Sequence, residues 1–364
     1  MHRVDILPEE SMSSWIFRQA HAKEISASHS DGAELLRIVQ EKEDLYDVDY
    51  GYAVSELERL TELTGGLHAM SLPDHSRHLV WGISDNGSRV SFCSICIEDD
   101  IRKHTFPVWR VQWSYCWYTV CHRHKCALTT LSGNYRPITL KNRGRCAFRF
   151  TVEKNHPSSK ASAAPKRNEL IPRISFLLEL IELAFKMQSH IDNLINLKHS
   201  DQAWREISAI RDFCDAAIFI ERGRVCPLAH DLTKYAFGRL AREYQLGPQT
   251  RKYDLEGTSC QERCARTRLS ALAVAACVFG VEGALDGLQR LSSAGREIGV
   301  LVPVTIPWLY TASVGGVGSI SRNWCLDRAR GYPIEIRDKL LEISSAPITP
   351  KEMAPTKGIP YSKS

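Results

Sequence analysis

The sequence lacks the patterns that would place it among membrane proteins, nucleotide hydrolases or common hydrolytic enzymes. No run of about 18 apolar residues occurs, so no segment is expected to span a membrane. The phosphate-binding pattern Gly-x4-Gly-Lys-Ser/Thr is absent, as are Gly-x-Ser-x-Gly and His-Glu-x2-His. The acidic residues show no spacing that singles out a metal-binding triad for DNA strand transfer. These absences argue against an enzyme of these classes.

An apolar signal segment is also absent from the start of the chain. The opening residues include Asp5, Glu9 and Glu10 with no apolar core, so secretion is not expected. The 12 cysteines of such a chain favour metal binding over a disulfide framework. We therefore expect a cytoplasmic protein.

The formal net charge of +5 conceals a segregation of charge along the chain. Residues 1–90 carry 8 basic and 16 acidic side chains, whereas residues 91–150 carry 10 basic and 3 acidic ones. An acidic N-terminal segment would repel phosphate, while the basic middle segment could approach nucleic acid. A solvated basic surface with no ligand is the alternative interpretation.

Two short cysteine motifs carry the clearest chemistry in the sequence. Cys93 and Cys96 form a Cys-x2-Cys knuckle, and Cys121 with His124 forms a Cys-x2-His knuckle after a spacer of 24 residues. Thiolate and imidazole are the ligands that zinc takes at four tetrahedral corners. Because four protein ligands leave no open position, the sequence predicts a structural zinc and argues against hydrolysis.

Several neighbouring residues leave the ligand set open. His122, Cys126 and Cys116 could each replace His124 at the fourth corner, although the spacing of His124 repeats the first knuckle. Ordinary reduced thiols are a further alternative, and a redox Cys-x2-Cys pair is another. A second zinc could be held by a looser set, with buried reduced thiols as its alternative: Cys226, His230, Cys260 and Cys264.

The two knuckles belong to a longer pattern that resembles a known family. Between them lie Trp109-Arg110 and Trp113, and Leu128 follows His124 after three residues. Residues 7–18 read Leu-Pro-Glu-Glu-Ser-Met-Ser-Ser-Trp-Ile-Phe-Arg. Both motifs resemble the TniQ/TnsD family of transposon targeting proteins, and the resemblance covers roughly the first 130 residues.

The resemblance implies a non-enzymatic transposition protein that recruits an AAA+ ATPase. Some members of the family dock on an RNA-guided CRISPR effector complex, and others read attachment-site DNA directly. A second copy of the chain, forming a homodimer, is a further expected partner. The alternatives are a zinc-dependent, sequence-specific DNA-binding regulator and a thiol oxidoreductase.

The fold expected from the sequence is mainly α. A helix over residues 54–63, Gly65-Gly66 and a short following segment give a helix-turn-helix outline, which we interpret as a protein-docking module. Residues 268–279 and 284–291 give a second such outline or a plain helical hairpin. The predicted organisation is an N-terminal helix-turn-helix-like domain at 1–90, a zinc-finger module at 91–150, a linker at 151–174, a C-terminal helical domain at 175–335 and a flexible tail at 336–364.

Two groups of residues are candidates for binding partners. Trp15 and Arg18 could dock a protein, although Trp15 is more typical of a core anchor. Trp109, Trp113 and Trp117 could stack bases, but packing over the knuckles is favoured. The basic candidates for phosphate contacts are Arg110, Arg123, Lys125, Lys141, Arg143, Arg145 and Arg149.

Overall fold

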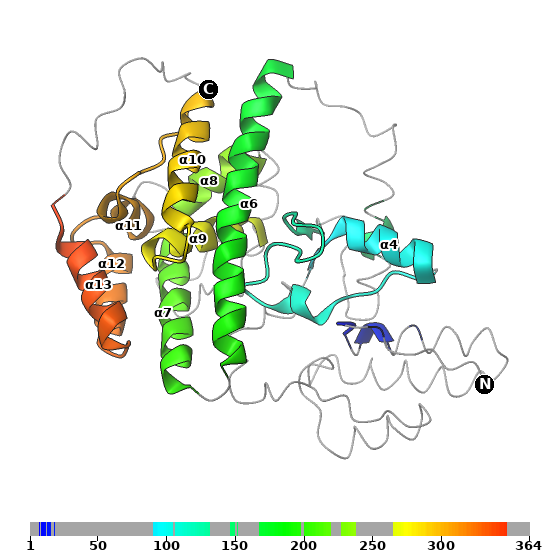
Figure 1. Ribbon diagram of the computed structural model, residues 1–364, viewed down its shortest axis with the longest axis horizontal. Helices are drawn as coiled ribbons and strands as arrows, with labels where there is room; N and C mark the ends of the chain where they lie inside the picture. Colours follow the sequence, from blue (N-terminus) through cyan, green and yellow to red (C-terminus); the bar gives the residue numbers. More distant parts are fainter. Residues whose placement is uncertain are drawn as a thin grey trace. The chain divides into compact units, whose positions relative to one another are not determined.

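The computed structural model divides the chain into two compact units. The first contains Met1–Tyr118 and Leu128–Ala161, and the second contains Thr119–Ala127 and Ser162–Ser364. Figure 1 draws the described residues in colour along the sequence. These residues are 7, 9–11, 13–15, 18, 90–104, 106–131, 146–149, 151, 167–197, 200–219, 227–237 and 265–347. The predicted helices within residues 19–89 lie outside them.

The described part of the first unit has very short strands. β1 (Ser91–Phe92) pairs antiparallel with β2 (Thr129–Thr130), and Ser91 Oγ lies 3.1 Å from Thr130 Oγ1. Helix α4 (Ser94–His104) follows β1, and the 3₁₀-helix η2 (Val111–Ser114) follows later. Residues 108–111 and 113–120 have strand-like composition, yet η2 occupies their centre. Most of their β-branched and aromatic side chains are buried in the structure.

The start of the chain is fastened to the segment before η2 by backbone contacts. Glu10 forms an isolated antiparallel bridge with Arg110, and the Ser11 amide donates to the Trp109 carbonyl at 2.8 Å. Ser11 Oγ also accepts from the Ser14 amide at 3.3 Å, which is the geometry of a helix N-cap. Ser13, Ser14, Trp15 and Arg18 are helical.

An aromatic cluster forms the core of the first unit. Trp109 and Trp113 meet edge to face with ring centroids 5.2 Å apart, and Phe92 lies 6.2 Å from Trp109. Trp117 stacks on Tyr115 at 4.8 Å. Trp109, Trp113 and Trp117 are all buried. These tryptophans therefore pack in the core, as favoured, and are not a surface platform for bases.

The second unit is an assembly of α-helices. Its helices are α6 (Arg167–Asn196), α7 (Asp201–Ile218), α8 (Leu228–Phe237), α9 (Ala265–Val278), α10 (Ala284–Glu297), α11 (Ile306–Val314), α12 (Ile320–Ala329) and α13 (Ile334–Ser345). The long helix α6 packs against α9 and α10, and α10 runs beside it in Figure 1. The expectation of a mainly α protein is confirmed. Among the described residues, no helix has both the length and the apolar character needed to cross a membrane.

Helix α9 is the centre of this unit. Of its residues only Arg266 is not buried, and α6, α7, α8 and α11 pack around it. Its many alanines have small side chains, which lets these helices approach closely. Helix α10 follows α9 and packs on α6. Helix α10 has an exposed face that includes Asp286, Gln289 and Arg290, so the helix-turn-helix outline and the plain hairpin both stay predictions.

Two predicted boundaries differ from the structure. Helix α6 begins at Arg167, inside the predicted linker at 151–174, so the helical segment starts before the predicted boundary at 175. The predicted flexible tail from residue 336 is wrong as far as Ser345, where α13 ends. Leu340 and Ile343 of α13 are buried, so this segment has the apolar anchors that a flexible tail lacks. The remaining domain boundaries stay predictions.

Candidate metal centre

The first knuckle lies where β1 ends and α4 begins. Cys93 directly precedes α4 and Cys96 lies in its first turn, while the Ile97 amide donates to the Cys93 carbonyl at 3.2 Å. Both thiols are fully buried. The N-terminal end of a helix carries partial positive charge, which favours the thiolate form that binds metals.

The second knuckle is a tight hairpin formed by residues 120–127. Val120 and Ala127 form an isolated bridge, and the Cys121 amide donates to the Cys126 carbonyl at 2.9 Å. The Lys125 amide donates to the Cys121 carbonyl at 2.8 Å, and Lys125 itself has a left-handed φ of 49°. This reversal brings Cys121 Sγ to 3.6 Å from His124 Nδ1.

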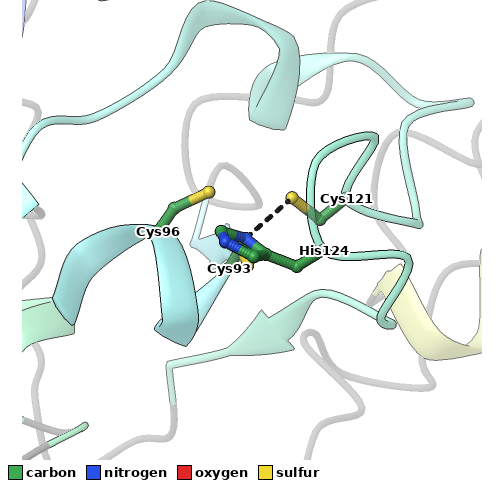
Figure 2. Close-up of side chains that lie close together, drawn as sticks. All are labelled: Cys93, Cys96, Cys121 and His124. Carbon is green, nitrogen blue, oxygen red and sulfur yellow. Dashed lines mark hydrogen bonds between the residues drawn. The ribbon is translucent and has the colours of Figure 1, made fainter. Parts of the chain in front are cut away.

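The two knuckles bring their four side chains together, as Figure 2 shows. The donor atoms of Cys93, Cys96, Cys121 and His124 all lie within 4.8 Å of one another. In a tetrahedral site with zinc–sulfur bonds of about 2.3 Å, neighbouring donors are separated by about 3.5–3.8 Å. The separation of 3.6 Å in the second knuckle fits this requirement. The four residues are therefore compatible with a metal ion bound by three thiolates and one imidazole.

The alternative ligands lie outside this group. Within the described residues, the four side chains above form the group that could hold a metal, and it includes none of His122, Cys126 and Cys116. His122 is exposed, and its Nε2 lies 3.3 Å from Asp192 Oδ2. The choice of His124 over its neighbours thus agrees with the geometry.

The second set of candidate ligands is mostly outside the described residues. Cys226, Cys260 and Cys264 belong to those whose placement is not described. His230 lies in α8, and its Nε2 is 2.8 Å from the Ile218 carbonyl oxygen, so this nitrogen donates to the backbone. A nitrogen engaged in this way is not free to bind a metal. A second zinc site stays a prediction.

Arg110 was expected to contact phosphate, and its placement corrects that expectation. Arg110 is 5% exposed, and its two terminal nitrogens donate to the Asp100 carboxylate at 2.7 and 2.8 Å. Burial acts to lower the pKa of Arg110, but the hydrogen bond and the charge of Asp100 outweigh it and raise the pKa. The guanidinium therefore stays charged inside the first unit, where it pairs with Asp100 and is not available to phosphate.

 Trp15 and Arg18 were candidates for docking a protein, and their burial corrects that expectation. Trp15 is 4% exposed and Arg18 is 8% exposed, so neither offers a free docking surface. Arg18 Nε donates to Glu10 Oε1 at 2.8 Å, and Ser14 Oγ donates to the same oxygen at 3.0 Å. These contacts make Trp15 a core residue and Arg18 half of a buried ion pair, so both are withdrawn as docking residues.

The other basic candidates have different surroundings. Arg123 is exposed in the second knuckle, and the Lys125 ammonium lies 3.4 Å from the centroid of the Phe185 ring. Arg149 is exposed in the short helical stretch at 146–149. The placement of Lys141, Arg143 and Arg145 is not described. Contact of these residues with nucleic acid stays a prediction.

Sequence reasoning missed two polar residues around the knuckles. Asp100 pairs with Arg110, and Gln188 of α6 forms three hydrogen bonds with the backbone at residues 119–120. Gln188 is fully buried, next to the buried Met187 and a turn from the buried Ile191. A glutamine on the apolar stripe of a helix was the available signal, because a buried amide requires partners.

Comparison with known families gives an identification for the first third of the chain. The TniQ family model matches residues 1–128. The chain carries a TniQ domain. The matched region contains all four residues of the candidate metal centre and ends directly after the second knuckle. No curated protein and no solved structure matches the chain. The resemblance inferred from the two sequence motifs is thereby confirmed, and the match associates residues 1–128 with transposition.

Proposed function

We propose that this protein is a non-enzymatic, cytoplasmic targeting protein of a transposition system. It links recognition of a target site to recruitment of an AAA+ regulator, which in turn engages the transposase. The target is presented by a CRISPR effector complex or by attachment-site DNA. The observation that carries this proposal is the TniQ match over residues 1–128, with the metal centre inside the matched region.

We propose zinc as the ion of this centre. Three thiolates and one imidazole are soft and borderline ligands, which suit zinc better than the hard cations magnesium and calcium. With four protein ligands, the ion would hold the two knuckles together and would leave no position for a substrate. The buried thiols at Cys93 and Cys96 also disfavour the thiol oxidoreductase, because exchange requires an accessible thiolate.

The charge of the chain supports docking on protein over direct DNA contact by the N-terminal segment. Residues 1–90 carry twice as many acidic as basic side chains, 16 against 8. Such a segment repels DNA phosphates at short range. Direct readout of attachment-site DNA, or a role as a DNA-binding regulator, would then depend on basic residues elsewhere in the chain.

The proposal is tested by co-purification of the tagged full-length protein with the AAA+ ATPase of the same transposon. We expect the wild-type protein to retain the ATPase, and the Cys93→Ser variant to lose it together with its metal. Cys277→Ser is the matched control, since Cys277 is also buried but lies in α9, outside the metal centre. Absence of the ATPase from the wild-type material would refute the adaptor role.

A DNA-binding assay separates the two modes of targeting. Specific binding of attachment-site DNA by the purified protein, with a steep dependence on salt, would identify direct readout. In that case Arg123→Glu should weaken binding, whereas the same change at the exposed Arg173 of α6 should not. Retention of a CRISPR effector complex without such binding would identify RNA-guided targeting.

A further inference from the structure

One face of helix α6 contacts the second knuckle. Phe185, Gln188 and Asp192 lie three and four residues apart, which places them on the same side of the helix on successive turns. Each of them contacts a residue between 119 and 125. The segment that carries Cys121 and His124 therefore packs at a defined position on α6.

Gln188 forms the central contact between α6 and this segment. Its Oε1 accepts hydrogen bonds from the amides of Thr119 and Val120 at 2.9 and 3.1 Å, and its Nε2 donates to the Val120 carbonyl at 2.9 Å. The side chain is fully buried. Three of the four hydrogen bonds that a glutamine amide usually makes are thus directed to the two residues before Cys121.

Phe185 and Asp192 hold the exposed side of the same hairpin. The His122 ring meets Phe185 edge to face with centroids 5.1 Å apart, and His122 Nε2 lies 3.3 Å from Asp192 Oδ2. Lys125 Nζ lies over the Phe185 ring at 3.4 Å. These contacts are more exposed than those of Gln188, so water competes with them more strongly.

We infer that Gln188 is a positioning residue for the metal centre, acting through the backbone that leads into Cys121. A fixed backbone at Thr119 and Val120 limits the directions that the Cys121 side chain can take. Partners of this outer-shell kind typically contribute about 10- to 100-fold to metal affinity. The inference depends on the assignment of a metal to the four ligands, and the transposition function does not enter it.

The test measures zinc affinity by competition with a chromophoric chelator. Gln188→Met removes the amide while keeping a side chain of similar length, and we expect zinc to bind about 10- to 100-fold more weakly. The matched control is Gln289→Met, the same change at an exposed position of α10, which should leave the affinity unchanged. Cobalt substituted for zinc should also show an altered ligand-field absorption in Gln188→Met and an unaltered one in the control.

A second measurement separates a positioning role from a purely structural one. Zinc raises the Tm of a protein that binds it only when folded, by an amount that follows its affinity. We expect this zinc-induced rise to shrink in Gln188→Met, whereas a structural role would lower the Tm equally with and without zinc. Gln188→Glu keeps an oxygen to accept from both amides but lacks the donor to the Val120 carbonyl, so its affinity should be intermediate.

The outcomes distinguish failure of this inference from failure of the metal assignment. Wild-type protein that binds no zinc would overturn the assignment itself, and the inference with it. Zinc binding in the wild-type protein, with equal affinity in both Gln188 variants, would overturn the inference alone.

Discussion

The buried ion pair between Asp100 and Arg110 should be far more costly to break than the exposed pair between the neighbouring Asp99 and Arg102. Both side chains of the buried pair are at most 7% exposed, and the pair is bidentate with distances of 2.7 and 2.8 Å. The neighbouring Asp99 pairs with Arg102 at 2.8 Å, but the Arg102 side chain is 70% exposed. Two adjacent aspartates of α4 thus form ion pairs in opposite environments, which allows a matched comparison.

The expected cost follows from the charge that each substitution leaves behind. Asp100→Ala leaves a buried guanidinium, which cannot lose its proton, so the free energy of unfolding should fall by about 3–5 kcal/mol. Asp99→Ala leaves Arg102 in water, so the change should be about 0–1 kcal/mol. The difference depends on burial, because the two distances are nearly equal.

Urea unfolding followed by tryptophan fluorescence measures both changes, since Trp109 and Trp113 are buried in the same unit. Arg110→Met combined with Asp100→Ala removes both charges, and it should be less destabilised than the sum of the two single variants. Equal losses for Asp99→Ala and Asp100→Ala would refute the reasoning. Single losses that simply add in the double variant would refute it as well.

Three further predictions concern the metal, one thiol and one glycine. Cys93→Ser and His124→Ala should each abolish stoichiometric zinc in elemental analysis, and wild-type zinc should be released in acid, because its ligands bind metal only when deprotonated. Burial raises the pKa of Cys277 to about 12 from its ordinary value of 9.0, so the folded state keeps this proton to a higher pH than the unfolded state. Stability should therefore fall between about pH 9 and 12, by up to about 4 kcal/mol, and Cys277→Ser should remove that part of the fall in urea titrations. Gly295→Ala would place Cβ 2.9 Å from the Val300 carbonyl oxygen, so the free energy of unfolding should drop by about 1–3 kcal/mol; an unchanged Tm would contradict this.

The ligands of the metal centre could be predicted because their chemistry is local. A two-residue spacing within each knuckle constrains both donors to one ion, whatever the rest of the fold does. The helix α9 could also be predicted, because its sequence is apolar over a length typical of helices. The structure gives Ala265–Val278, within a few residues of the expected 268–279.

The surface roles of Arg110, Trp15 and Arg18 could not be judged from the sequence. The sequence around a basic residue beside a metal motif does not distinguish an arginine that binds phosphate from one that pairs with a buried carboxylate. The partners of the two arginines, Asp100 and Glu10, lie 10 and 8 residues away along the chain. No helical or strand period links such positions, so the pairing follows only from the tertiary fold.

The sparse secondary structure around the knuckles gives the metal a large part in ordering this region. Strands β1 and β2 contain two residues each, and an isolated pair of strands this short is at best marginally stable in water. The buried pairs Glu10–Arg18 and Asp100–Arg110 contribute little net stability, because desolvation offsets most of their attraction. A structural zinc contributes about 10–16 kcal/mol of apparent binding free energy in small zinc domains. A bound ion would therefore exceed the other local contributions, and its removal should unfold the region around β1 and β2 before the helical unit, which has its own core around α9.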